Sequence, residues 1–373
     1  MPREGSGGGG TAGGSLARSI PAGPGDVGPE WLESALAPRF PGVRVDAVEL
    51  TETRHVTNTH SFLRVRYADQ RGAPEALFCK MLPLDPARRA LLAASGMGPM
   101  EVLFYSQLAP QLPFRVPDVF VARQDPRDGA FVLLMEDLGA TGCRVPDGTW
   151  GISPDSASAA LEDLAALHVR FEDPRRRKSE VPWAPLAKDV PPPGMSSLQF
   201  GLDNHRDRLS DAFARIAQIY IADPGQLVAL WADGPGPATV VHGDPHIGNL
   251  FDDHGRTGFL DWGVMNVTTP LRDASYFINI GMAVEDRRTH ERDLLRHYLE
   301  VRSALGGAPI GWDEAWRAHR LHAMYCVVAA CSIVKFPPDA TPRRRVFASG
   351  FLARVEAAIN DLDALGAWTA ACG

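Results

Sequence analysis

The chain has 373 residues, of which 45 % are hydrophobic and 22 % charged, and its net charge is −7. This is the composition of a globular protein, and at roughly 100–200 residues per domain the length suggests two domains or lobes. The mildly acidic balance provides no overall basic field, which argues against a nucleic acid or an anionic membrane as the partner.

The five cysteines are scattered and form no C-x-x-C motif. This pattern argues against a disulfide framework or a zinc ribbon and favours a reducing, cytoplasmic compartment. The N-terminus has no apolar stretch typical of a signal peptide, and the most apolar run, 323–334, is shorter than the roughly 20 residues that span a bilayer. We therefore expect neither secretion nor a membrane partner.

The first third of the chain predicts a small lobe of strands. Residues 1–26 are rich in glycine and lack an apolar period, so we expect a disordered tail there. A short amphipathic helix begins at Pro29, and one further helix is predicted over 99–108. Strand-like runs with alternating or continuous apolar residues occupy 43–50, 62–67, 76–82, 118–122 and 131–136. Residues 27–137 thus predict a five-stranded antiparallel lobe with one inserted helix.

After Gly139 helical periods dominate, so residues 138–373 predict a mostly helical second lobe and the chain as a whole an α+β fold. The proline-rich stretch 174–197 is expected to be a loop. Short strands are expected near 240–241, 249–251 and 258–260. The predicted helices cover 154–171, 198–222, 271–284, 286–305, 312–334 and 343–365.

The strongest chemical signal is His242-Gly-Asp244-Pro-His246-Ile-Gly-Asn249, followed by Asp261-Trp-Gly. Phosphoryl transfer to a hydroxyl needs a carboxylate for the nucleophile's proton and oxygen ligands for Mg²⁺ on the nucleotide phosphates. Asp244 and Asn249 have the D-x-x-x-x-N spacing of a kinase catalytic loop, and Asp261 stands where a kinase has the Asp of D-F-G. We expect Asp244 to be the base and Asn249 and Asp261 to be the Mg²⁺ ligands.

The motif H-G-D-x-H-x-G-N followed by L-D-W resembles the aminoglycoside phosphotransferase-type family of small-molecule kinases, which is related to choline/ethanolamine and ecdysteroid-kinase-like proteins. Four further segments carry the same resemblance, which extends over about 28–340. They are Glu101-Val-Leu-Phe-Tyr-x-x-Leu108, Leu133-Leu-Met-Glu-Asp-Leu138, Leu164-Ala-Ala-Leu-His168 and Leu271-Arg-Asp-Ala-Ser-Tyr-Phe277.

The resemblance implies a bilobal protein-kinase-like fold that uses ATP, or GTP, with Mg²⁺ to phosphorylate a hydroxyl of a small molecule. Lys80, on the third strand, would contact the α and β phosphates and be held by Glu101. It is one of only four lysines among 38 basic residues, so a lysine here needs a reason. The backbone around Glu136, Asp137 and Leu138 would form the hinge and bind the adenine edge.

The loop over 51–60 would cover the phosphates but departs from the family by containing no glycine. Asn58, with Thr57, Thr59 and Ser61, offers donors instead; the alternative is a plain polar hairpin. His246 is expected to contact either the γ-phosphate or the loop backbone. His242 is expected to brace the loop, and Asp273 to accept backbone N–H bonds from it.

Two other functions stay open. A protein kinase is disfavoured because Gly243 replaces the Arg of H-R-D, His246 replaces Lys, and no A-P-E segment follows. A pseudokinase would have lost Lys80, Asp244, Asn249 or Asp261, and all four are present. The sequence does not determine the acceptor or the oligomeric state. Its bias toward Arg, Ala, Gly and Pro suggests a high-GC bacterial gene, and such a source would fit antibiotic modification or specialised metabolism. Candidate acceptor contacts are Asp203, His205, Asp207, Trp262, Glu285, His322 and Tyr325.

Overall fold

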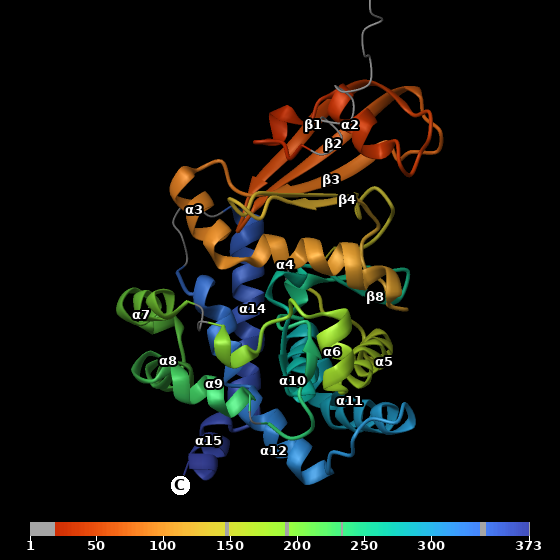
Figure 1. Cartoon of the computed structure of the whole chain (residues 1–373). Helices are drawn as coiled ribbons and strands as arrows, with labels where there is room; N and C mark the ends of the chain where they lie inside the picture. The colour runs from red at the N-terminus through yellow and green to blue at the C-terminus, as the bar shows by residue number, and fades with distance from the viewer. Residues whose placement is uncertain (1–18, 146–148, 191–193, 233, 336–340, 373) are drawn as a thin grey trace, which may run out of the picture. The chain divides into compact units, whose positions relative to one another are not determined.

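The computed structural model describes residues 19–145, 149–190, 194–232, 234–335 and 341–372 (Figure 1). The chain divides into two compact units. Unit 1 comprises Met1–Gln111 and Pro117–Gly142, and unit 2 comprises Leu112–Val116 and Cys143–Gly373. The short segment Leu112–Val116 therefore belongs to the second unit although its neighbours on both sides belong to the first.

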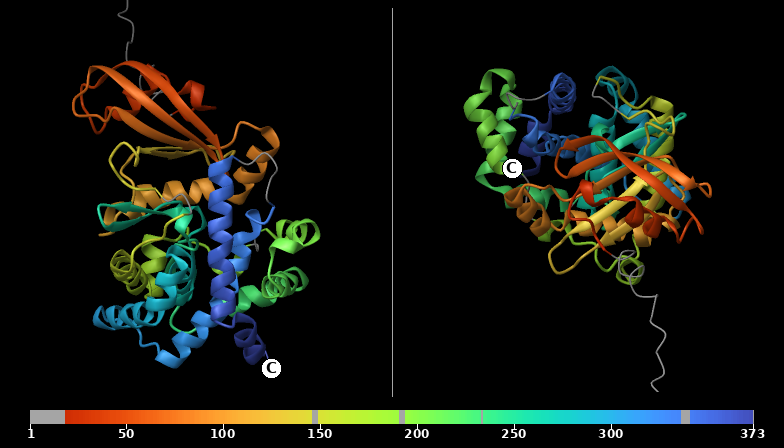
Figure 2. Two further views of the ribbon diagram at one scale, coloured as in Figure 1. Left: turned by 180° about the vertical axis from the view of Figure 1, so that it is seen from behind. Right: turned by 90° about the horizontal axis from the view of Figure 1, so that it is seen from above.

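Unit 1 is built on a five-stranded antiparallel sheet in the order β1-β2-β3-β5-β4, whose twist is visible in Figure 2. All six residues of β5 are buried, because this interior strand is covered on both faces, and its sequence FVLLME is correspondingly apolar. The predicted five-stranded antiparallel sheet is confirmed. The strands are β1 (Arg44–His55), β2 (Thr59–Asp69), β3 (Ala76–Met81), β4 (Val119–Gln124) and β5 (Phe131–Glu136).

The helices of unit 1 differ from expectation between β3 and β4, where two helices replace the single one predicted over 99–108. These are α3 (Pro86–Ser95) and α4 (Met97–Leu103), and α4 continues as a π-helical turn, η2 (Phe104–Leu108). Gly96, with φ +71°, ends α3 and starts α4, a left-handed conformation that glycine adopts without strain. No residue of α3 is buried, and its first turn is capped by Asp85, whose side chain accepts from Arg88 N.

The expected disordered tail over 1–26 falls largely on residues 1–18, which lie outside the described residues. Over 19–26 the structure differs from the expectation, because this segment packs on α2 (Pro29–Leu36). Trp31 Nε1 donates to Ser19 O over 3.1 Å, and Pro24–Asp26 forms a short 3₁₀ turn, η1. Trp31 itself is buried in the core between α2 and the sheet, so its indole anchors the segment.

Unit 2 is mostly helical, as predicted, with two small two-stranded sheets. The strand β6 (Thr239–Val241) pairs with β9 (Asn266–Thr268), and β7 (Leu250–Asp253) pairs with β8 (Arg256–Phe259). The longer helices are α5 (Pro154–Arg170), α7 (Met195–Asn204), α8 (Asp211–Ala222), α9 (Pro224–Ala232), α10 (Pro270–Gly281), α11 (Val284–Ala304), α12 (Trp312–His322), α14 (Pro342–Asp361) and α15 (Ala364–Cys372).

Two predicted helices and one predicted loop differ in detail from the structure. The helix expected over 198–222 is divided into α7 and α8, because Leu209 is extended and the Ser210 hydroxyl caps α8 by accepting from Phe213 N. The one expected over 312–334 ends at His322 and continues as α13 (Tyr325–Ala329) and η8 (Ala330–Ser332). The loop expected over 174–197 contains α6 (Pro174–Glu180), capped by Asp173.

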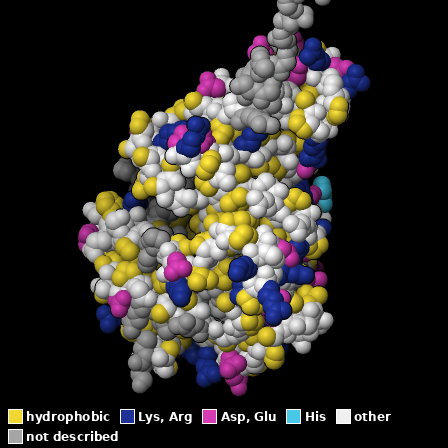
Figure 3. Space-filling view, viewed as in Figure 1, with side chains coloured by type: hydrophobic (Ala, Val, Ile, Leu, Met, Phe, Trp, Pro, Cys, Tyr) yellow, Lys and Arg dark blue, Asp and Glu magenta, His cyan; other side chains and the backbone are white. Residues whose placement is uncertain are grey.

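Helix α10 forms the centre of unit 2, and all twelve of its residues are buried. Its polar residues Arg272 and Asp273 make hydrogen bonds to the loop that follows β6, as a buried polar group requires. No helix in the described parts of the chain is long and apolar enough to cross a bilayer. On the face drawn in Figure 3, acidic and basic side chains are interspersed among hydrophobic ones.

Candidate active site

In unit 1, Lys80 and Glu101 form a buried ion pair. Lys80 Nζ lies 2.7 Å from Glu101 Oε2, and the two residues are 3 % and 2 % exposed. Lys80 is placed by β3, where it pairs with His60 of β2 and Leu133 of β5, and Glu101 is placed by α4. The side-chain pair expected from the sequence is thus present within this unit.

The strand register shows which side chains share the face of Lys80. Residues paired across antiparallel strands lie on the same face, and alternate residues along a strand do too. Phe78, two residues before Lys80, therefore lies on the Lys80 face, and Phe78 packs edge-on against Phe62 and His60. This aromatic cluster was missed by the sequence reasoning, although a period of two from Lys80 identifies Phe78 directly.

The same register corrects the roles expected of Thr59 and Ser61. Ser61 pairs with Cys79, and Thr59 pairs with Met81, so both side chains lie on the face opposite Lys80. Both residues are fully buried on that face, beside the apolar core that contains Cys79 and Met81. Their hydroxyls are therefore directed away from Lys80. Asn58, at the turn between β1 and β2, is also buried, at 4 % exposed, and its carbonyl accepts from Val56 N.

The expected hinge follows β5, and its acidic side chains hold the turn. Glu136 Oε1 accepts from Asp118 N at 2.8 Å, and Glu136 N donates to Asp118 O at 2.9 Å. Asp137 Oδ1 accepts from the amides of Gly139 and Ala140, while Oδ2 accepts from Arg64 Nη1 at 3.2 Å. The carboxylates of Glu136 and Asp137 are thus engaged within unit 1.

In unit 2, the catalytic-loop residues predicted from the sequence converge on Asp244. Asn249 Nδ2 donates to Asp244 O at 2.9 Å and to Asp244 Oδ2 at 3.1 Å. His246 Nε2 lies 3.5 Å from Asp244 Oδ2, and His246 Nδ1 accepts from Gly248 N at 2.9 Å. Tyr276 OH donates to Asp244 Oδ1 at 3.1 Å. Tyr276 was quoted only as part of a motif, and its contact with Asp244 was not foreseen.

The β7–β8 hairpin brings Asn249 and Asp261 together. Leu250 pairs with Phe259, and Leu260 N donates to Asn249 O at 2.8 Å, so Asp261 follows a residue that is bonded to Asn249. Because the Asn249 amide nitrogen is used by Asp244, the amide oxygen is the group of Asn249 that can ligate a cation. Asp261 adopts a left-handed backbone conformation with φ +58°.

His242 and Asp273 support this loop from behind. Asp273 Oδ2 and Oδ1 accept from the amides of His242 and Gly243, at 2.5 and 2.9 Å. His242 Nε2 donates to Leu260 O, and its Nδ1 accepts from Asp244 N. Burial lowers the pKa of His242, which favours this neutral form. His168 Nε2 lies 3.4 Å from Asp273 Oδ2, so a third element, α5, contributes to the support.

Burial would raise the pKa of Asp273, but the hydrogen bonds from His168 and from the Gly243 amide hold that pKa below its usual value. Gly243 has φ +87°, and a Cβ there would lie 2.5 Å from Val264 O. The backbone here therefore strongly disfavours any larger residue, including the arginine of a protein-kinase H-R-D loop.

Three of the seven candidate acceptor contacts, Trp262, His322 and Tyr325, are buried. Trp262 is fully buried and stacks on Phe114 with ring centroids 5.7 Å apart. His322 is 1 % exposed. Asp203 and Asp207 are exposed, Glu285 pairs with Arg288, and His205 contacts the carbonyl of Lys335. Tyr325 is buried beneath the guanidinium of Arg272.

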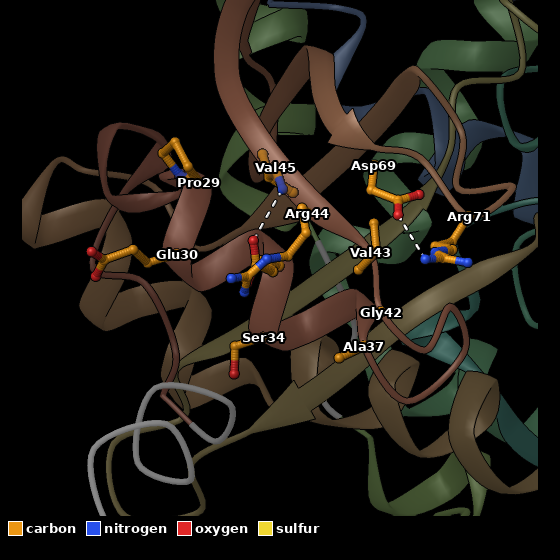
Figure 4. A pocket seen from close by; sticks show the side chains of 11 residues that line it. Pro29, Glu30, Ser34, Ala37, Gly42, Val43, Arg44, Val45, Asp69 and Arg71 are labelled. Carbon is orange, nitrogen blue, oxygen red and sulfur yellow. Dashed lines mark hydrogen bonds and ion pairs between the residues drawn. The ribbon is translucent and has the colours of Figure 1, made fainter. Parts of the chain in front are cut away.

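A hollow of about 790 Å³ lies elsewhere, between α2 and β1 of unit 1 (Figure 4). Two of its acidic side chains have partners, because Glu33 accepts from Arg44 and from Val45 N, and Asp69 pairs with Arg71. None of the residues predicted for catalysis or nucleotide binding lines it. The hollow therefore contributes nothing to the candidate site.

We compared the chain with curated proteins, with solved structures and with profiles of protein families. A search of curated proteins finds no match. Among solved structures, a choline/ethanolamine kinase family protein from Mesorhizobium loti is similar at 18 % identity, covering 93 % of both chains, with a TM-score of 0.44. A choline kinase from Streptococcus pneumoniae matches at 12 % identity over 88 % of this chain and 98 % of that one, with a TM-score of 0.47.

A macrolide 2'-phosphotransferase from Brachybacterium faecium matches at 17 % identity, covering 83 % of this chain and all of that one, with a TM-score of 0.42. The profile of the phosphotransferase enzyme family matches residues 70–320, which contain Lys80, the catalytic loop and Asp261. The resemblance found in the sequence is thereby confirmed, and the chain belongs to the phosphotransferase enzyme family.

Proposed function

We propose that the chain transfers the γ-phosphate of ATP or GTP to a hydroxyl group of a small molecule, with Asp244 as the base. The observation that supports this best is the state of the Asp244 carboxylate, whose two oxygens are held by separate donors, Tyr276 on one and Asn249 on the other. Its side chain is still 28 % exposed, so a hydroxyl can reach it. A carboxylate that is both oriented and accessible suits a general base.

In this reaction the acceptor oxygen attacks the γ-phosphorus, the bond from that phosphorus to the bridging oxygen breaks, and the nucleoside diphosphate leaves. Asp244 accepts the proton of the acceptor hydroxyl. His246, whose Nε2 faces Asp244 Oδ2 at 3.5 Å, is proposed to assist there or at the phosphate. A loose transition state leaves most of the catalysis to positioning and charge stabilisation, which these fixed contacts can supply.

Asn249 and Asp261 would hold Mg²⁺, which when bound neutralises charge on the phosphates. Their oxygens fit this ion chemically, because Mg²⁺ prefers hard oxygen ligands and keeps several water and phosphate ligands. Among the described residues, no group of three or more His, Cys, Asp and Glu side chains could hold a metal ion on its own. A site with two protein ligands therefore depends on the nucleotide to complete it.

Unit 1 would contribute the nucleotide contacts. Lys80, held by Glu101, is proposed to contact the α and β phosphates. The Phe78 ring, on the same face as Lys80, offers a flat apolar surface for a purine. Because Glu136 N is already donated to Asp118, Leu138 is proposed to supply the backbone donor for the base. Asn58 is proposed to act through its backbone at the phosphate loop.

The test is a screen of hydroxylated metabolites and antibiotics with ATP or GTP and Mg²⁺, read by the mass gain of one phosphate. The control is Asp244→Asn, for which we expect kcat to fall by roughly 10²–10⁴ while nucleotide binding is kept, the usual range for losing a positioned acid–base group. Wild-type turnover in that variant would contradict the role of Asp244. Nucleotide binding with no transfer to any acceptor would favour the pseudokinase alternative.

A further inference from the structure

We infer that Tyr276 is a positioning residue for this reaction: its hydroxyl holds the Asp244 carboxylate in the orientation that accepts the proton of the acceptor. The inference rests on the proposed function and adds a residue to it. Within unit 2, Tyr276 and Arg272 of α10 and Tyr325 of α13 form a connected set of contacts that reaches both Gly243 and Asp244.

The first step is the geometry at Asp244. Tyr276 OH donates to Oδ1 at 3.1 Å, and Asn249 Nδ2 donates to Oδ2 at 3.1 Å. The two donors come from different elements, because Tyr276 lies on α10 and Asn249 on the loop before β7. Rotation of the carboxylate therefore breaks at least one of these hydrogen bonds. One lone pair on each oxygen remains for the acceptor.

The second step is that Tyr276 is itself immobilised. It is 1 % exposed, and its ring packs edge-on against Tyr325 at a centroid distance of 5.0 Å. The Arg272 guanidinium lies 3.7 Å from the centroid of the Tyr325 ring, and Arg272 Nη2 donates to Gly243 O at 3.0 Å. Gly243 directly precedes Asp244. The same cluster thus fixes the backbone before Asp244 and the carboxylate of Asp244.

The third step concerns the proton on Tyr276. Burial raises the pKa of Tyr276 well above its usual value, and the negative charge of Asp244 raises it further. The phenol therefore stays protonated over the pH range in which a kinase works and donates to Asp244 throughout. A donor of this kind orients the base without competing with it for the proton.

The experiment compares Tyr276→Phe with Tyr220→Phe. Tyr220, on α8, is as deeply buried at 1 % exposed, so its variant loses the same oxygen from another part of unit 2. For Tyr276→Phe we expect kcat to fall about 10- to 100-fold, the loss expected for one hydrogen bond to a charged group, with KM for the nucleotide unchanged within about twofold. Tyr220→Phe should match the wild type in both constants. Thermal melts followed by circular dichroism check the folding of both variants.

A double-mutant cycle separates positioning from a general structural effect. If Tyr276 acts through Asp244, adding Tyr276→Phe to Asp244→Asn changes the residual kcat by less than about twofold. A full second loss in that background, or a kcat for Tyr276→Phe within about twofold of the wild type, would overturn the inference. Absence of transfer by the wild-type chain would overturn the proposed function itself and this role with it. Unchanged transfer by Tyr276→Phe overturns the role alone.

Discussion

Variants of the buried Lys80–Glu101 pair should affect stability and activity differently, and the two effects can be measured separately. The side chains are 4 % and 2 % exposed and lie 2.7 Å apart, so Glu101→Ala leaves an ammonium buried without its carboxylate. Removing one partner of a buried pair costs about 3–5 kcal/mol, a large share of the 5–15 kcal/mol that typically stabilises a domain. We therefore expect a clear loss of stability in unit 1.

The measurement must report on unit 1 alone, because two units can unfold in separate transitions. Trp31 is the one tryptophan in the sequence of unit 1 and lies in its core. Fluorotryptophan labelling, with the Trp31 resonance assigned from Trp31→Phe, follows its unfolding in urea. The double variant Lys80→Met/Glu101→Met should recover most of the lost stability, since apolar side chains of similar volume replace such pairs at little cost.

Activity should not recover in that double variant, because the contact proposed between Lys80 and the phosphates would be lost. Lys80→Arg should also fail to restore turnover, since the planar, bulkier guanidinium does not replace a compact ammonium at this buried position. Steady-state kinetics against ATP at saturating acceptor provide the comparison with Lys80→Ala. The reasoning is refuted if Lys80→Arg has near-normal kcat, or if Glu101→Ala unfolds at the wild-type urea concentration.

Gly243→Ala should lower both stability and kcat, by about 1–3 kcal/mol for the unfolding free energy, because its Cβ would lie 2.5 Å from Val264 O. Gly255→Ala is the matched control in thermal melts, since Gly255 also has positive φ, +91°, but open space around it; equal losses would exclude the clash. Burial lowers the pKa of His322 to about 3. Between about pH 3 and pH 6.5 the His322 side chain is therefore protonated in the unfolded chain but neutral in the folded chain. Keeping His322 neutral therefore adds its full share to the free energy of unfolding above pH 6.5, and this share is lost as the pH falls toward 3. His322→Leu should reduce the slope of unfolding free energy against pH in that window by about 1.4 kcal/mol per pH unit, and an unchanged slope in urea titrations would contradict this.

The sheet and the catalytic loop were predictable because each depends on local pattern. Alternating or continuous apolar runs located all five strands, and the motif spacing identified Asn249 and Asp261, whose chain segments the β7–β8 hairpin places side by side. Each of these signals is carried by one short stretch of sequence. The bounds of the strands still shifted, because β1 extends to His55 through residues that are largely exposed and carry no apolar signal.

The parts that escaped prediction depend on register and on distant contacts. Thr59 and Ser61 lie on the face opposite Lys80 because of strand pairing, which composition alone does not reveal. In the sequence, Tyr276 looks like one more apolar position of a buried helix. The structure shows that its hydroxyl donates to Asp244, 32 residues earlier in the chain. Helix α3 was not predicted, and none of its residues is buried.

Asp273 links the backbone before Asp244 to the buried helices of unit 2. The amides of His242 and Gly243 both donate to its buried carboxylate, which also contacts His168 of α5. Such amides can exchange their hydrogens with water only when the surrounding helices separate, not through local fraying of a loop. The backbone beside Asp244, the proposed base, should therefore exchange as slowly as the core of α10, unlike most loops, so Asp244 would stay in place between turnovers.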